Sequence, residues 1–143
     1  MKRHIKHFPY LILILSIISF LATLFFSEIL KLPPCVLCWY QRIAMYPIIP
    51  ILAVGILRKD KHAPLYILPL SIAGWVISIY HNLLYYHVIP EAIAPCQTGV
   101  SCTAKLIQLF GFIDIPLASF FAFTIINICT IIYLKHRNNL EDL

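Results

Sequence analysis

Charged residues are scarce in this sequence. Asp, Glu, Lys and Arg make up 12% of the 143 residues, whereas 61% are hydrophobic. Soluble domains average about 25% charged and about 45–50% apolar residues, so this composition excludes an ordinary soluble domain. The net charge of +5 does not indicate nucleic-acid binding, because the sequence has no basic stripe or aromatic platform. We predict a membrane protein with one domain, residues 1–143, and no soluble module.

Internal repeats, low-complexity tracts and a small-residue cleavage site after the first apolar run are also missing. That run, residues 8–27, carries no charge and is longer than the about 7–15 residues of a signal-peptide core. We therefore expect it to be retained as a first membrane span.

Four segments are apolar over about 20 residues, the length that a membrane-spanning helix needs. They are residues 8–27, 38–57, 65–87 and 115–134. Pro47 and Pro50 should kink the second of them. The predicted fold is an all-α integral membrane protein, a bundle of four transmembrane helices.

The basic residues predict the orientation of this bundle. They gather before the first span, between the second and third spans and after the fourth: Lys2, Arg3, Lys6, Arg58, Lys59, Lys61, Lys135 and Arg137. The other two loops carry only Lys31 and Lys105. The positive-inside rule then puts both termini in the cytoplasm and these two loops outside the cytoplasmic (inner) membrane. In the longer outer loop, residues 103–112 fit either a short amphipathic interfacial helix or an ordinary loop.

Each outer loop carries a close pair of cysteines. Cys35 and Cys38 form a C-x-x-C motif directly before the second span. The dipole and free N–H groups of a helix N-terminus stabilise a thiolate there, which is the reactive form of cysteine. Two packing cysteines, or a structural zinc site shared with Cys96 and Cys102, are alternatives. Redox chemistry is favoured because x5 spacing is unlike a zinc knuckle and because exported thiols are usually oxidised.

The second pair, Cys96 and Cys102, encloses five residues around Gly99. A disulfide can close so small a loop if the Cα atoms come within about 7 Å. We expect this bridge to be exposed, easily attacked and redox-active; a static staple for the long loop is the alternative.

Arg42 and His81 are ionisable residues inside predicted spans. Counting at 1.5 Å per residue puts Arg42 about one helical turn below the outer edge, on the face of Cys38, and His81 at about the same depth. Such a residue is a functional-site candidate by default. Arg42 could stabilise a Cys38 thiolate and bind a quinone carbonyl, or extend to the outer headgroups. His81 could transfer protons or merely pack, and Cys129, near the opposite face, is expected to pack.

Together these features resemble the DsbB family of quinone-dependent thiol oxidases, in particular its short BdbC-type members. The most specific element is the block Cys35-Val36-Leu37-Cys38-Trp39-Tyr40-Gln41-Arg42. Supporting elements are His81-Asn82-Leu83-Leu84, and Cys102 followed by Phe110-Gly111 and Asp114-Ile115-Pro116.

The resemblance implies a mechanism and partners. A reduced, extracytoplasmic thioredoxin-fold protein of the DsbA or BdbD kind would donate electrons to a Cys96–Cys102 disulfide, with Cys96 forming the mixed disulfide. Cys102 would pass the electrons to Cys35 and Cys38. A membrane quinone, ubiquinone or menaquinone, would accept them near Cys38, Arg42 and His81. The close spacing of Cys96 and Cys102 departs from longer members and leaves open whether Cys102 moves to Cys35.

Three other functions use the same features. A four-helix enzyme resembling vitamin K epoxide reductase would run electrons in the opposite direction. A soft-metal carrier would need thiol or polar residues along a path through the membrane, where only Cys129 lies deep. In a structural membrane protein the disulfides would only staple the loops, and a buried Arg42 argues against this.

Overall fold

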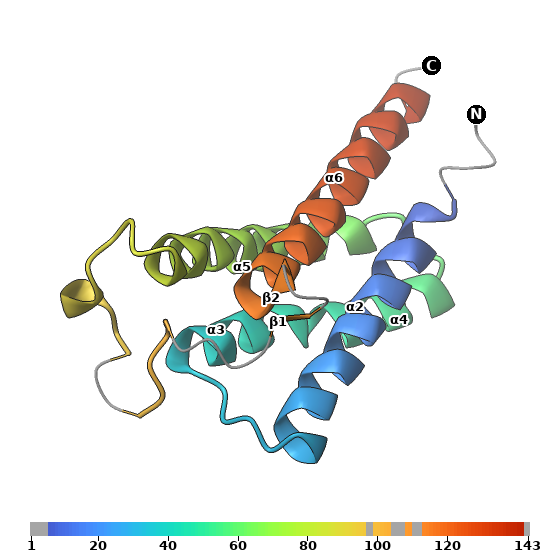
Figure 1. Ribbon diagram of the computed structural model, residues 1–143. Helices are drawn as coiled ribbons and strands as arrows, with labels where there is room; N and C mark the ends of the chain where they lie inside the picture. The colour runs from blue at the N-terminus through green and yellow to red at the C-terminus, as the bar shows by residue number, and fades with distance from the viewer. Residues whose placement is uncertain (1–5, 97–98, 104–107, 110–112, 142–143) are drawn as a thin grey trace.

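The computed structural model describes residues 6–96, 99–103, 108–109 and 113–141. Within these ranges four helical segments are long and apolar enough to cross a membrane, so the predicted four-span helical fold is confirmed (Figure 1). The segments comprise α2 (Phe8–Leu24) with a π-helical turn (Phe25–Ile29), α3 (Val36–Met45) with α4 (Ile48–Leu57), α5 (Ala63–Tyr85), and α6 (Ile115–Glu141).

The connection between α5 and α6 contains short pieces of other structure. A 3-10 turn (Glu91–Ile93) is followed by strands β1 (Gln108–Leu109) and β2 (Ile113–Asp114), which pair in antiparallel fashion. An interfacial helix over residues 103–112 is therefore wrong at residues 108–109, because their backbone groups pair with a neighbouring strand instead of a helical turn. Apart from Thr103, the rest of that segment lies outside the described residues.

Pro47 interrupts the second span, as predicted. Proline has no N–H to donate, so α3 ends at Met45 and α4 begins again at Ile48. Pro50 falls in the first turn of α4, where a missing N–H breaks no bond within the helix. The break separates the cysteine-bearing α3 from the core-packing α4.

α5 and α6 make the most extensive contact between helices. Gly74 of α5 lies against the ring of Phe123 of α6, so the helices approach closely. Nearby, the Ser71 hydroxyl donates to Asn127 Oδ1 at 2.7 Å, and both residues are buried. The side chains of Ser71 and Asn127 thus satisfy each other's hydrogen bonds inside the bundle, where no water is available to do so.

The helices leave apolar side chains on the outer surface. On α2 an exposed stripe with helical spacing consists of Leu11, Ile14, Ile18 and Leu21. In Figure 1 the start of α2, the end of α6 and the α4–α5 connection lie toward one side of the molecule. The α2–α3 and α5–α6 connections, which carry the cysteine pairs, lie toward the other side.

Candidate redox site

Cys35 and Cys38 lie at the N-terminus of α3, following Pro33 and Pro34. Cys35 is the N-cap: its backbone is extended, and its sulfur accepts the Cys38 backbone N–H at 3.3 Å. The two sulfur atoms are 2.9 Å apart, and both residues are free thiols. At the first turn of α3, the Cys35 sulfur can therefore accept hydrogen bonds from both the thiol and the backbone N–H of Cys38.

This arrangement favours Cys35 as the thiolate. A hydrogen bond from the Cys38 thiol is the largest of the influences that together lower the pKa of Cys35 from its ordinary 9.0 to about 4. Burial opposes the charged form, since Cys35 is 5% exposed, but His81 and the Cys38 backbone N–H support it. The sequence allows a thiolate on Cys38, stabilised by Arg42, whereas the N-cap geometry selects Cys35.

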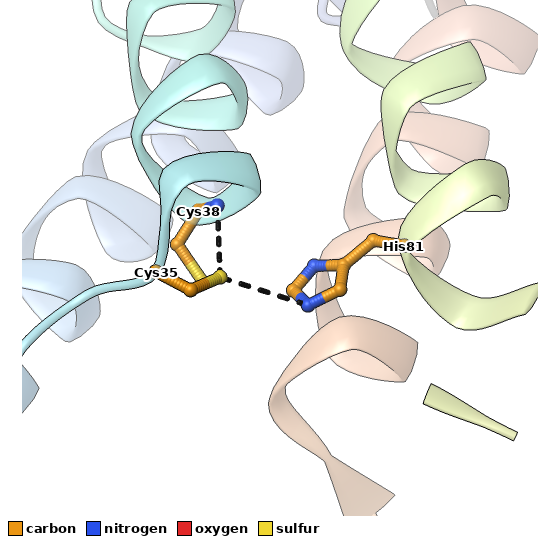
Figure 2. Close-up of side chains that lie close together, drawn as sticks. All are labelled: Cys35, Cys38 and His81. Atoms are coloured by element: carbon orange, nitrogen blue, oxygen red, sulfur yellow. Dashed lines mark hydrogen bonds between the residues drawn. The ribbon is translucent and has the colours of Figure 1, made fainter. Parts of the chain in front are cut away.

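His81 of α5 faces this pair (Figure 2). Its Nε2 atom lies 3.8 Å from the Cys35 sulfur and 3.3 Å from the Cys102 carbonyl oxygen. On the other side of the ring, Nδ1 lies 3.2 Å from Nε2 of Gln41. Gln41 is not among the site residues predicted from the sequence, although its i+3 spacing from Cys38 puts both on one helix face.

Cys96 and Cys102 form a disulfide with a Cα–Cα distance of 5.8 Å. The expectation that this bridge is exposed is wrong, because Cys96 is 5% and Cys102 3% exposed. The loop folds over the start of α3, and both residues share a buried cluster with Cys35, Leu37, Leu84 and Ala94. The two cysteine pairs are thus brought together in one apolar environment.

Glu91 holds this loop in place. Its Oε1 atom accepts hydrogen bonds from the hydroxyls of Ser101 and Thr103, which flank Cys102. Glu91 is exposed, and Ser101 and Thr103 are half-buried on either side of the buried Cys102. The carboxylate therefore ties the 3-10 turn to the cysteine loop.

Arg42 is held by α2. Its Nη2 donates to the Thr23 carbonyl oxygen at 3.1 Å and to the Ser27 hydroxyl at 2.5 Å. Its guanidinium carbon lies 5.5 Å from the centre of the Trp39 ring. These hydrogen bonds come from the protein itself, so Arg42 does not depend on lipid headgroups for its partners.

A cavity of about 200 Å³ connects these groups. It lies between α2, α3, α5 and the start of α6, and its lining includes Cys35, Cys38, Arg42, His81 and Cys102. The remaining lining is mainly apolar, with Met45, Ile115, Ala122 and Phe123 among its members. Such a lining fits a flat apolar ring that carries hydrogen-bond acceptors, as a quinone does.

The same side chains include groups that could bind a metal ion, as the zinc-site and metal-carrier alternatives require. Ligand-type atoms of Cys35, Cys38 and His81 lie within 4.8 Å of one another, a grouping that suits a soft metal ion. A zinc site made of all four paired cysteines does not form in this state, because Cys96 and Cys102 are bonded to each other. Cys129 packs against the core of the bundle, as expected of a small apolar side chain.

Comparisons with known proteins bear on the chemistry of this site. The sequence matches the family described as disulfide bond formation protein DsbB over residues 5–134. It is 44% identical over 124 residues to a probable disulfide formation protein C 2 of Bacillus cereus, covering 87% of each chain. It is 43% identical over 119 residues to disulfide bond formation protein C of Bacillus subtilis (strain 168), covering 83% of this chain and 86% of the relative. No solved structure matches significantly. The paired thiols and the buried disulfide therefore belong to a member of the DsbB family of disulfide bond formation proteins.

Proposed function

We propose that this protein is a membrane thiol oxidase that reoxidises an extracytoplasmic thioredoxin-fold dithiol protein and passes the electrons to a membrane quinone. It would thereby support disulfide formation in exported proteins. The observation that carries the proposal is the convergence of both cysteine pairs on His81: the Cys35 sulfur and the Cys102 carbonyl oxygen share its Nε2. Family membership supports the thiol–disulfide chemistry.

The proposed electron path begins at the loop disulfide. A partner thiolate attacks Cys96, breaks the Cys96–Cys102 bond and releases Cys102 as a thiolate. The second partner thiol then displaces Cys96, and the partner leaves with its own disulfide. Two electrons have now moved to Cys96 and Cys102.

Internal exchange moves these electrons to the second pair. The Cys102 thiolate attacks Cys35 in a Cys35–Cys38 disulfide and releases Cys38. Cys96 then attacks Cys102, re-forms the loop disulfide and releases Cys35. The product has Cys96 bonded to Cys102 and free thiols at Cys35 and Cys38, which is the state of the structure.

The cavity beside Cys38 is the proposed quinone site. A quinone held there would supply the acceptor for the two electrons that Cys35 and Cys38 release as their disulfide re-forms, and it would take up two protons. Arg42 would supply a charged donor in the apolar cavity, prepositioned by its bonds to Thr23 and Ser27. We also propose that the cysteine-bearing side faces outward, since the lysines and arginines gather at the other end of the helices.

The direct test is the thiol state of purified protein mixed with a reduced thioredoxin-fold dithiol protein, with and without a soluble short-chain quinone. We expect continuous partner oxidation only with quinone, and none in Cys35→Ser or Cys38→Ser. Cys129→Ala is the matched control and should retain nearly full activity. A vitamin K epoxide reductase-like enzyme would instead reduce the partner's disulfide, and a metal carrier would copurify with bound metal and oxidise no partner.

The order of attack has a separate test. Cys102 touches His81 through its carbonyl oxygen, which supports Cys102 as the inner cysteine and Cys96 as the one that takes the partner. A partner with a single cysteine, activated as a mixed disulfide with thionitrobenzoate, has no second thiol to displace Cys96. Cys102→Ser should therefore release thionitrobenzoate and trap a mixed disulfide between Cys96 and this partner, seen as a band on non-reducing gels. Trapping only in Cys96→Ser would reverse the assignment.

A further inference from the structure

The proton on the His81 ring can be placed from its neighbours. Nε2 lies 3.3 Å from the carbonyl oxygen of Cys102, an atom that only accepts hydrogen bonds. Nε2 must therefore carry a hydrogen to satisfy this buried contact. In a neutral ring the other nitrogen, Nδ1, then has a lone pair and needs a donor.

Gln41 supplies that donor. Its side-chain Nε2 lies 3.2 Å from His81 Nδ1, and the residue is 7% exposed. The contact joins α3 to α5, one helical turn below Cys38. Among the described residues, the other ionisable groups around the ring are Cys35 and Cys38, with Arg42, Tyr46 and Tyr85 lining the same cavity.

We propose that Gln41 is a positioning residue that fixes His81 in the Nε2–H tautomer, so that one N–H serves both the Cys35 sulfur and the Cys102 carbonyl. Gln41 touches neither cysteine sulfur in any described contact and acts through the ring. The proposal deepens the proposed function and rests on it for its catalytic meaning, because it concerns the exchange between the two cysteine pairs.

The opposite tautomer would remove both contacts. A lone pair on Nε2 would face a carbonyl oxygen and an electron-rich sulfur, neither of which can donate to it once Cys35 is a thiolate. The loop carrying Cys102 would lose its link to the ring beside Cys35. Exchange between the pairs should then slow by roughly threefold to tenfold, the effect expected from losing one ordinary hydrogen bond.

The tautomer can be measured directly on the full chain in detergent. Protonated and unprotonated ring nitrogens have well-separated ¹⁵N chemical shifts, and a His81→Phe variant assigns the signal in ¹⁵N-histidine-labelled protein. We expect protonated Nε2 and unprotonated Nδ1 in the unmodified protein. Gln41→Met should populate the other tautomer in part, and Gln41→Glu should protonate Nδ1, since a carboxylate only accepts.

Asn127→Leu is the control, because it removes a buried amide from the bundle without contact to His81 and should leave the ring signals unchanged. If Gln41→Met does not fold, Gln41→Glu provides the test, since it keeps the size of the side chain and a polar end group. A protonated Nδ1 in the unmodified protein, or ring shifts that both Gln41 variants leave unchanged, would overturn the proposal.

A kinetic readout tests the consequence. Fully oxidised protein without quinone is mixed with dithiothreitol, quenched and alkylated, and the conversion of Cys35–Cys38 to thiols is followed by mass spectrometry. Gln41→Met should slow this conversion by roughly threefold to tenfold while reduction of Cys96–Cys102 keeps its rate. Equal conversion rates would overturn the positioning role. Neither measurement uses the partner or quinone, so failure of the proposed function would be seen separately.

Discussion

At the scale of single residues, Cys35 shows how a buried sulfur keeps its charge. Burial alone disfavours a thiolate, and the side chain is almost fully covered. Hydrogen bonds from the Cys38 thiol and the Cys38 backbone N–H outweigh this effect, because they bond the charged form. Because Cys35 is the N-cap of α3, the Cys38 backbone N–H is available as the second donor, and no additional residue is needed.

We therefore predict that Cys35 ionises near pH 4 in the reduced protein, in line with a pKa lowered to about 4. A lowered pKa leaves the thiolate present above that pH and lost below it. The measurement is thiolate absorbance and alkylation against pH in a Cys96→Ala/Cys102→Ala/Cys129→Ala background. The pH midpoint is used, because access to a buried sulfur affects the absolute rate but not the midpoint.

Variants at Cys38 provide the control for this prediction. Cys38→Ala removes the side-chain donor and should raise the Cys35 midpoint, whereas Cys38→Ser keeps a hydroxyl donor and should raise it less. If Cys35 in the unmodified protein titrates with a midpoint near the ordinary cysteine pKa of 9.0, these hydrogen bonds do not stabilise the thiolate.

Arg42→Met should raise the KM for a short-chain quinone by roughly tenfold to a hundredfold, the loss expected for a charge-assisted hydrogen bond. The KM for the protein partner should change little. Arg42→Lys should recover part of the effect, because a point charge replaces a planar fork. Lys31→Met is the control, since it removes a positive charge outside the cavity lining. A well-folded Arg42→Met protein with normal quinone KM would remove the main support for the site.

At the scale of helices, sequence patterns predict the structural features that depend on local composition and residue spacing. The apolar runs predict the four spans, and the missing N–H of Pro47 predicts the break between α3 and α4. Gln41 could have been predicted as a site residue in the same way, because its spacing from Cys38 puts it on the cavity face. It was not predicted because its side chain is a neutral amide, whereas the charge of Arg42 and the ionisable ring of His81 mark those residues as unusual within a membrane span.

Other features depend on contacts between distant segments and could not be predicted in this way. The burial of Cys96 and Cys102 arises because their loop folds over α3 and packs on Leu84 of α5. The pairing of Gln108 with Asp114 likewise replaces the interfacial helix that an amphipathic pattern allowed. Local periodicity contains no information on which segment will cover or pair with another.

The close approach of α5 and α6 gives a prediction at this scale. A Cβ at Gly74 would overlap the ring of the buried Phe123, so Gly74→Ala should destabilise the protein by about 1–3 kcal/mol. Thermal unfolding in detergent measures this change. Phe123→Leu shortens the facing side chain, and the double variant should lose less than the sum of the single variants. Additive losses would show that the two positions do not meet.

At the scale of the whole molecule, the structure buries the disulfide that is proposed to react with the partner protein. In the proposed function the Cys96–Cys102 disulfide meets a partner thiolate, yet both residues are buried against α3 and α5. The loop must therefore move before its sulfur atoms can be attacked. Glu91 opposes that movement, because its carboxylate accepts hydrogen bonds from Ser101 and Thr103 on either side of Cys102.

Glu91→Ala should accordingly speed the reduction of Cys96–Cys102 by dithiothreitol. The two exposed hydrogen bonds contribute about 0.5–1.5 kcal/mol each, or about 1–3 kcal/mol together, so losing the tether should raise the rate by roughly fivefold to a hundredfold. Acid quenching and alkylation at successive times measure the reduced fraction, and Glu91→Gln, which keeps one acceptor oxygen, should give an intermediate rate. Glu28→Ala is the control: it removes an exposed carboxylate from the π-helical turn after α2 and should leave the rate unchanged. If Glu91→Ala and Glu28→Ala both match the unmodified protein, opening of the loop is not limited by this tether, and contacts within the buried cluster must control access to the disulfide.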